Sequence, residues 1–290
     1  MTVAPRKQLR DLLAGEHIIM APGAYDALLA RIIEQAGFPS IYMTGSGVAH
    51  TLLGEPDLGL VSMKEMADKV AYLADAVSIP IIADADTGYG NALNVQRTVR
   101  AYERAGVSAI QLEDQTFPKR CGHLDGKDVT SAEEMLGKLH AAVDARTDAD
   151  MAIVARTDAA VIFGIDEAIE RGQRYAEAGA DIIFVEAPRT VDEMRKINKS
   201  IDKPCLANLV EGGKTPILPA AELEEIGYRV AIFANFLTRT IARTAANALQ
   251  VLKRDGSTLA LADQMEDLMS LNAIIGLKDM LARAERYSGA

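Results

Sequence analysis

The chain has 290 residues, of which 49% are hydrophobic and 25% charged, and its formal net charge at pH 7 is −10. This composition is typical of a soluble globular protein, and the negative charge argues against a nucleic-acid partner, because phosphate backbones bind cationic surfaces. No apolar run approaches the roughly 20 residues of a membrane span, and residues 1–15 lack the apolar stretch of a signal peptide. We therefore expect a cytoplasmic protein with no membrane partner.

Short apolar runs recur along the chain, each after a segment with helical periodicity. Several follow a helix-ending glycine directly, as at Gly37, Gly106 and Gly179. Strands that alternate with helices predict a parallel sheet, and their continuous apolarity indicates burial on both faces. The runs are residues 17–21, 40–43, 79–83, 109–112, 151–155, 181–185, 203–207 and 228–233.

The number of these strands and the chain length, which is near the usual size of about 250 residues, together predict a (β/α)8 barrel. We expect one domain over residues 1–290, with a C-terminal helical extension over residues 240–290. Met and Leu residues at helical spacing between Leu261 and Leu271 give this extension an apolar face. That face packs either on its own barrel or on another subunit.

Polar residues follow most of the predicted strands at the point where each strand ends. In a barrel these positions line one mouth. Buried ionised groups cost several kcal/mol each unless they are paired or bind metal, so a group this acidic calls for a cation. The residues are Thr44, Gly45, Ser46, Asp84, Asp86, Glu113, Arg156, Asp158, Glu186 and Asn208.

Four acids form a predicted metal site. Asp84 and Asp86 stand two residues apart on one strand end, and Glu113 and the loop residue Asp57 complete a set of oxygen ligands. Oxygen ligands without histidine or thiolate favour Mg²⁺ or Mn²⁺ over zinc. Because Mg²⁺ keeps several waters, a single direct carboxylate suffices. The alternative is that the Asp-Ala-Asp segment is a solvated loop or supplies helix caps.

Arg156 predicts an anion site, because a guanidinium in an apolar core binds planar carboxylates through two parallel hydrogen bonds. A substrate carboxylate is the expected partner. Structural pairing with Glu186 is the competing explanation.

The segment Lys119-Arg120-Cys121-Gly122-His123 places a cysteine beside cations, a setting that favours the reactive thiolate. The alternative is a basic surface loop with an incidental thiol. The only other cysteine, Cys205, lies in an apolar run and is interpreted as a core residue. Two cysteines cannot form a disulfide framework and lack zinc-ligand spacing, which agrees with a reducing compartment.

These motifs together resemble the isocitrate lyase and phosphoenolpyruvate mutase superfamily. The resemblance implies a Mg²⁺-dependent (β/α)8 barrel, usually a homotetramer in which the eighth helix is exchanged between paired subunits, with the cysteine on a gating loop. It implies that residues 241–252 and part of the apolar face beyond them cross to another subunit. The matching segments are residues 22–26, 44–47, 56–57, 83–88, 112–115, 119–123, 155–158, 185–188 and 207–208.

The resemblance also implies a role for each site residue. Asp84 would bind the metal directly, whereas Asp57, Asp86 and Glu113 would act mainly through waters. The expected substrate-binding residues are Thr44, Gly45, Ser46, Gly122, Arg156, Glu186 and Asn208. Thr44 stands where relatives often carry serine. The expected catalytic residues are Cys121 as the acid and Lys119, Arg120 and His123 as groups that stabilise charge. Tyr42 is a candidate for the base that takes the hydroxyl proton.

The implied reaction is retro-aldol cleavage of a 2-hydroxy di- or tricarboxylate to pyruvate or another 2-oxo acid and a carboxylate. Cys121 favours this reaction over phosphorus transfer, because the phosphomutase branch typically has asparagine at this position. Isocitrate lyases proper are longer and contain an inserted region that this chain lacks. Residues 207–216 resemble the branch that acts on alkylmalates such as 2,3-dimethylmalate. Cleavage of 2-methylisocitrate, hydrolysis of oxaloacetate, a phosphonomutase and a non-catalytic dicarboxylate-binding barrel are the alternatives.

Overall fold

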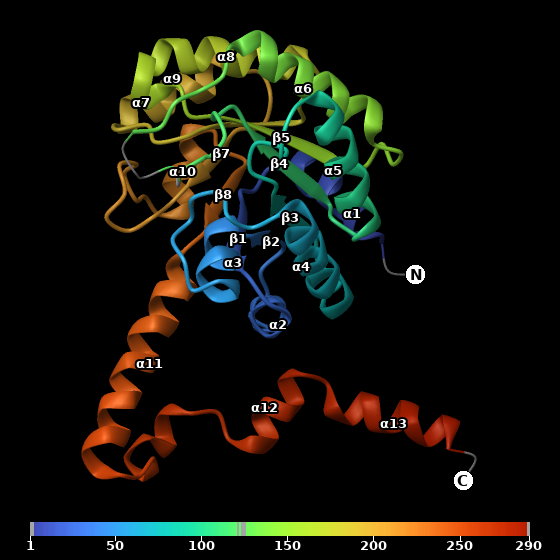
Figure 1. Cartoon of the computed structure of the whole chain (residues 1–290), viewed down its shortest axis with the longest axis vertical. Coiled ribbons are helices and arrows are strands. Elements are labelled where there is room, and N and C mark those ends of the chain that lie inside the picture. Colours follow the sequence, from blue (N-terminus) through green and yellow to red (C-terminus); the bar gives the residue numbers. More distant parts are fainter. Residues whose placement is uncertain (1–2, 121, 123–125, 289–290) are drawn as a thin grey trace.

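The computed structural model describes residues 3–120, 122 and 126–288 and contains a barrel of eight parallel strands (Figure 1). Successive strands pair in order, β8 pairs with β1, and a bridge between Ile183 and Cys205 links β6 to β7, so the sheet is nearly closed. Each strand overlaps one predicted apolar run, and the predicted (β/α)8 barrel is confirmed. The strands are β1 Ile19–Ala24, β2 Ile41–Met43, β3 Ile81–Asp84, β4 Ala109–Glu113, β5 Ala152–Thr157, β6 Ile182–Val185, β7 Leu206–Asn208 and β8 Val230–Phe233.

Helices cover the outside of the barrel, and side chains at their first turns define where several of them begin. Ser62 and Glu65 form a reciprocal capping box at the start of α4, and Asn91 and Asn94 do the same for α5. Gly227 ends α10 in the left-handed conformation that favours glycine. The helices are α2 Ala27–Gln35, α3 Gly45–Leu52, α4 Met63–Ala76, α5 Ala92–Arg104, α6 Ala132–Ala145, α7 Ala160–Phe163, α8 Ile165–Glu177, α9 Val191–Ser200 and α10 Ala220–Ile226.

The N-terminal helix α1 (Pro5–Ala14) closes the amino end of the barrel. Its Leu9 is fully buried in a cluster with alternate residues of the strands, which fill the barrel interior. Arg6 donates to the Val107 carbonyl (2.9 Å), and Arg10 donates to Asp181 (2.7 Å); both acceptors lie just before strands β4 and β6. Because α1 covers the amino end, the carboxyl end of the barrel is the one left open.

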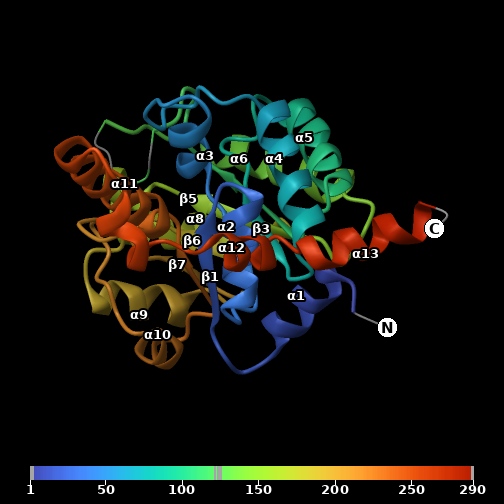
Figure 2. The same ribbon diagram turned by 90° about the horizontal axis from the view of Figure 1, so that it is seen from below.

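The C-terminal helices project from the barrel instead of covering it (Figures 1 and 2). They are α11 Phe236–Asp255, the 3₁₀ helix η1 Leu259–Gln264, α12 Leu268–Ile274 and α13 Leu277–Tyr287. No residue of α11 is buried, and among the described residues no helix is long and apolar enough to cross a membrane. These helices, residues 236–287, are called the C-terminal arm below. The arm contacts α2, where Gln35 donates to the Ile274 carbonyl (3.0 Å).

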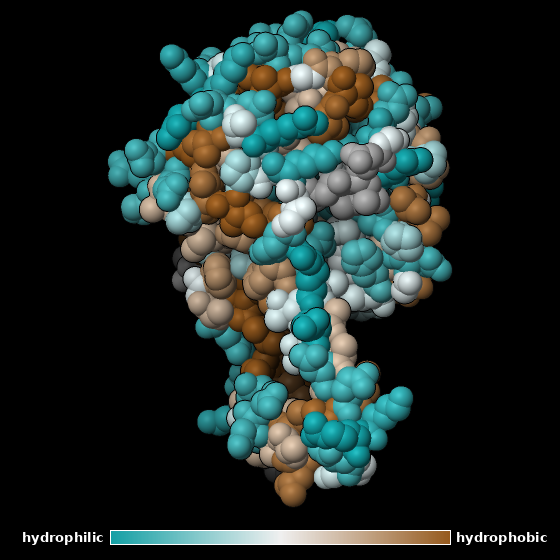
Figure 3. Space-filling model, turned by 90° about the vertical axis from the view of Figure 1, so that its left-hand side faces the viewer, coloured by the Kyte–Doolittle hydropathy of each residue, from teal (hydrophilic) through white to brown (hydrophobic). Residues whose placement is uncertain are grey.

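The predicted apolar face of this extension stays largely uncovered by its own barrel. Met269 is 72% exposed, and Leu268 and Met265 are also exposed, whereas Leu261 is buried. Apolar surface is visible along the projecting part of the molecule in Figure 3. Packing on its own barrel therefore does not account for this face.

Candidate active site

The carboxyl ends of the strands surround one cavity at the open mouth of the barrel. Except for Ala234 and Asn235, every lining residue is one that the sequence predicted. The other predicted residues that the structure describes, Gly45, Asp86 and Glu113, contact this lining. The cavity is lined by Tyr42, Thr44, Ser46, Asp57, Asp84, Lys119, Arg120, Gly122, Arg156, Glu186, Asn208, Ala234 and Asn235.

The segment after β2 presents the amino end of helix α3 to the cavity. Thr44 caps this helix, because its hydroxyl accepts a hydrogen bond from the Gly47 N–H (3.2 Å). The Ser46 hydroxyl lies 3.1 Å from that of Thr44 and donates to Asn235 Oδ1 (2.7 Å). Free N–H groups and the helix dipole at such an end favour a bound anion.

Asp84 ends β3 next to this segment. A β-carbon at Gly45 would lie 2.6 Å from Asp84 Oδ2, so only glycine allows this close approach. Asp84 Oδ1 accepts hydrogen bonds from Gln111 Nε2 (3.3 Å) and from the backbone N–H of Asp86 (3.1 Å). Asp86 has a φ of 47°, a left-handed conformation that few residues other than glycine, asparagine and aspartate adopt, so the segment after β3 is constrained.

Lys119 lies between two of the predicted metal ligands. Its ammonium is 2.6 Å from Asp57 Oδ1 and 2.7 Å from Asp86 Oδ1. Burial raises the pKa of Asp86 to about 6, although Lys119 opposes this shift. Burial lowers the pKa of Lys119, but the surrounding carboxylates outweigh it and raise that pKa well above its ordinary value. Lys119 is thus a charged partner of these acids.

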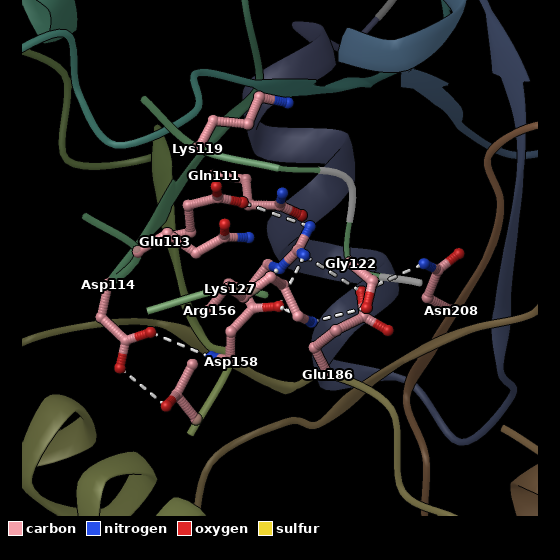
Figure 4. A network of polar contacts seen from close by, with 12 residues as sticks. Gln111, Glu113, Asp114, Lys119, Gly122, Lys127, Arg156, Asp158, Glu186 and Asn208 are labelled. Carbon is pink, nitrogen blue, oxygen red and sulfur yellow. Dashed lines mark hydrogen bonds and ion pairs between the residues drawn. The ribbon is translucent and has the colours of Figure 1, made fainter. Parts of the chain in front are cut away.

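Arg156 is the centre of a buried ionic network (Figure 4). Its Nε and Nη2 donate to the two carboxylate oxygens of Asp158 (2.9 and 3.1 Å), and ion pairs join it to Glu113 (3.3 Å) and Glu186 (3.4 Å). The competing structural pairing with Glu186 is therefore present, but Asp158 is the main partner. The guanidinium also lies over the Phe184 ring, 5.1 Å from its centre.

Asp114 supports this network from behind. Its carboxylate accepts hydrogen bonds from the Thr157 hydroxyl (2.7 Å), the Asp158 N–H (2.9 Å) and the Tyr175 hydroxyl (2.9 Å). Arg171 from α8 adds an ion pair at 3.1 Å. These bonds fix the end of β5, which carries Arg156.

The loop after β4 lies against Arg156. A β-carbon at Gly122 would be 2.5 Å from Arg156 Nη2 and 2.6 Å from Glu186 Oε2, so a larger residue there would have to displace these side chains. Gln115 holds the same loop by accepting from the Arg120 N–H and donating to the Arg120 carbonyl, both at 2.9 Å. Cys121 and His123, which were predicted to be catalytic, lie outside the described residues.

Tyr42 is buried, and its hydroxyl donates to Gln111 Oε1 (3.2 Å). Burial raises the pKa of this phenol well above its ordinary value. The protonated form therefore dominates near neutral pH, which makes Tyr42 a hydrogen-bond donor and a poor base.

Among the described residues of this site, buried carboxylates outnumber buried cations. Among the described residues, Oε1 of Glu113 and Oε1 of Glu186 have no hydrogen-bond partner, which leaves buried lone pairs for a further positive group. Within the same residues no three metal-ligating side chains converge on one point. The buried acids are Asp57, Asp84, Asp86, Glu113, Asp114, Asp158 and Glu186, and the buried cations are Lys119, Lys127, Arg156 and Arg171.

The family model described as phosphoenolpyruvate phosphomutase matches residues 9–253, a stretch that includes all eight strands and every predicted site residue. The chain belongs to this family. The resemblance inferred from the motifs is thereby confirmed, and the protein is an enzyme of the lyase kind.

Relatives within the family cover nearly the whole chain. It is 47% identical to the 2,3-dimethylmalate lyase of Eubacterium barkeri over 97% of each chain, and 42% identical to the 2-methylisocitrate lyase of Aeropyrum pernix over 98% of this chain and 91% of that one. A structure of oxaloacetate acetylhydrolase with the inhibitor 3,3-difluorooxalacetate has a TM-score of 0.94 at 35% identity, covering 99% of this chain and 98% of that one. A structure of phosphonopyruvate hydrolase with oxalate and Mg²⁺ has a TM-score of 0.89 at 33% identity, covering 98% and 99%.

Several polar residues of this family member's site were not predicted as site residues. Asp158 was noted at a strand end but received no role, although its position was the available signal. Gln111 lies inside an apolar strand, and Asn235 follows one, so a strand-end search can find only the second. Asp114 directly follows β4, so its strand-end position was a signal, whereas Lys127 gave none, because its buried partner Asp158 is far away in the sequence.

Proposed function

We propose that this enzyme cleaves the bond between C2 and C3 of a 2-hydroxy di- or tricarboxylate and releases pyruvate or another 2-oxo acid and a carboxylate. One observation carries the proposal. The amino end of α3 and the Arg156 side chain, two groups suited to hold anions, lie in one cavity around the acids of β3 and β4. A substrate with two carboxylates and a hydroxyl matches that set of groups.

We assign a Mg²⁺ ion to the acids of this site, with Mn²⁺ as an acceptable substitute. The donors are all oxygen, and the excess of buried carboxylates over cations favours a divalent ion. Asp84 would bind it directly, and Asp57, Asp86 and Glu113 mainly through waters, which is compatible with the lack of three converging ligands among the described residues. When bound, the ion supplies Lewis-acid stabilisation of negative charge on the substrate oxygens.

The side chains and backbone of this chain would then perform the remaining tasks. The N–H groups near Gly45 and Ser46 hold one carboxylate, and Arg156, positioned by Asp158, holds a second. Glu186 and Asn208 bond to each other (3.3 Å) and border the same cavity. When the hydroxyl proton passes to a base of the site, the oxygen forms the C2 carbonyl of the 2-oxo acid. The C2–C3 bond then breaks, and its electron pair moves to C3.

The carbanionic product of that cleavage needs a proton on C3. We assign this role to Cys121, with Arg120, His123 and Lys119 stabilising the charge that develops. Transfer of the thiol proton completes the carboxylate product and leaves a thiolate beside cations, which is the form they favour.

Alkylmalates are the first substrate class that we propose, because the chain shares 47% identity with a 2,3-dimethylmalate lyase. 2-Methylisocitrate is the second class, on 42% identity. Hydrolysis of oxaloacetate is a separate candidate function, favoured by the structural similarity to oxaloacetate acetylhydrolase. A phosphonomutase is the remaining alternative.

One experiment separates these possibilities. 2,3-Dimethylmalate, citramalate, 2-methylisocitrate and oxaloacetate are assayed side by side with Mg²⁺, and products are identified by NMR. We expect release of pyruvate or a related 2-oxo acid from one of the first three. Oxalate and acetate from oxaloacetate alone would replace the lyase with a hydrolase, and no turnover of any of them would overturn the proposal.

We also propose that the C-terminal arm packs on a second copy of the chain within a homotetramer. Leu249 and Leu252 of α11 and Met269 of α12 are exposed here, as are Leu28 and Ile32 on α2, the helix that α12 contacts. Burial of such faces between subunits removes apolar surface from water.

A further inference from the structure

Lys127 holds a buried position between two parts of the site. It belongs to the segment between β4 and α6, yet its side chain is only 1% exposed. Its ammonium donates to Asp158 Oδ1 (2.6 Å) and to the Gly122 carbonyl (2.5 Å). A buried ammonium is costly unless such partners satisfy it, so both contacts constrain the structure.

The two partners of Lys127 lead to the same guanidinium. Asp158 Oδ1 accepts from Lys127 and also from Arg156 Nη2 (3.1 Å), so the two cations share one carboxylate. Gly122 approaches Arg156 so closely that a β-carbon there would lie 2.5 Å from Nη2. Lys127 therefore ties the loop backbone to the counter-ion of Arg156, as Figure 4 shows.

Other contacts hold the loop at its first part. Lys119 pairs with Asp57 and Asp86, and Gln115 holds the Arg120 backbone. Lys127 holds the later part, and among the described residues of the loop it bonds to Asp158, the carboxylate that pairs with Arg156. Loss of the Lys127 ammonium leaves Asp158 paired with Arg156 alone. It also leaves the Gly122 carbonyl without the donor that fixes its position.

We propose that Lys127 is a positioning residue for the reaction: it fixes the Gly122 peptide against Arg156 and holds Asp158 in the orientation that aligns the guanidinium. It acts through these groups and not on the substrate. The role in turnover rests on the proposed function, whereas the effect on loop order does not.

The test compares Lys127→Met, which keeps the side-chain length but removes the charge, with Lys64→Met. Lys64 forms an exposed ion pair with Asp68 on α4, so the control removes the same charge far from the loop. We expect Lys127→Met to lower kcat by about 10- to 100-fold, the range produced by small misplacements of catalytic groups. Lys64→Met keeps the parent kcat.

A second readout does not depend on turnover. Hydrogen exchange of the Arg120 and Thr130 amides, which donate to Gln115 and Asp114, is measured for each variant. We expect at least about tenfold faster exchange at Arg120 in Lys127→Met, with Ile153 in strand β5 unchanged. If the parent turns over none of the substrates, the proposed reaction fails, but the exchange measurement still decides the role of Lys127.

Rescue separates positioning from simple stability. Lys127→Ala is assayed with and without n-propylammonium, and with n-propanol as the uncharged control. We expect the amine alone to restore part of kcat and of the slow exchange. Parent kcat and parent exchange in Lys127→Met would overturn the proposal, and so would a lowered Tm with unchanged kcat.

Discussion

Gly122 lies against Arg156 so closely that a single methyl group on its Cα would stand 2.5 Å from the guanidinium. The backbone of the loop after β4 therefore lies in close contact with the Arg156 side chain. This contact leads to the first prediction.

Gly122→Ala should lower kcat/KM by at least about tenfold, because the added methyl group displaces either the loop or Arg156. The matched control is Gly137→Ala in α6, where a β-carbon meets nothing within 4 Å. That change should leave kinetics unaltered and stabilise the helix by about 0.5–1 kcal/mol. Steady-state kinetics and thermal unfolding of both variants test these expectations. A Gly122→Ala enzyme with the kcat/KM of the parent would contradict the close fit.

Removal of the metal should abolish turnover, because the acids of β3 and β4 would then lack the divalent partner that we assign to them. EDTA treatment followed by Mg²⁺ or Mn²⁺ addition measures this. Asp84→Ala should not regain activity at ordinary Mg²⁺ concentrations. Full activity of thoroughly stripped enzyme would show that the assignment is wrong.

Cys121→Ser should lower kcat by at least about 10²-fold with little change in substrate binding, because serine is far less acidic than cysteine. Cys205→Ser is the control. Cys205 is buried in the core, as predicted, and burial raises the pKa of its thiol to about 12. This change should mainly destabilise the fold, by about 1–3 kcal/mol.

The same cysteine pair allows a labelling test of ligand binding. Iodoacetamide should modify Cys121 in preference to the buried Cys205, and substrate or a product analogue should slow that modification. Peptide mass spectrometry measures the two sites separately. Equal labelling with and without ligand would argue against closure of the loop over the substrate.

Leu9→Ala should destabilise the protein by about 2–5 kcal/mol, because it removes the apolar side chain with which α1 fills the amino end of the barrel. Leu93→Ala, at a site that is 75% exposed, should cost less than about 0.5 kcal/mol. Denaturant unfolding measures both. The kcat of folded Leu9→Ala should equal that of the parent, since the catalytic mouth is at the other end.

The assembly should be larger than a monomer, since the arm leaves apolar side chains such as Met269 uncovered. Light scattering at micromolar concentration should give the mass of a tetramer. Met269→Asp should shift the mass toward smaller species, whereas Glu266→Asp nearby should not. A stable monomer of the parent chain would rule the arm exchange out.

The sequence by itself determined the strands and the residues at their ends. Strands buried on both faces need continuous apolar runs, and a parallel barrel sends every carboxyl end to one mouth, so Asp84, Arg156 and Glu186 could be grouped without coordinates. The acid content of those ends was enough to predict a metal site. These inferences depend on local pattern and on topology alone.

The tertiary structure decided how those residues are paired. Lys127 meets Asp158 across 31 residues and Asp114 meets Tyr175 across 61, distances over which no periodicity carries information. The sequence of α1 is that of an ordinary amphipathic helix, and only packing reveals Leu9 inside the barrel. Only the tertiary structure shows that α11 leaves the barrel, because the local pattern of an amphipathic helix does not specify which surface covers its apolar face.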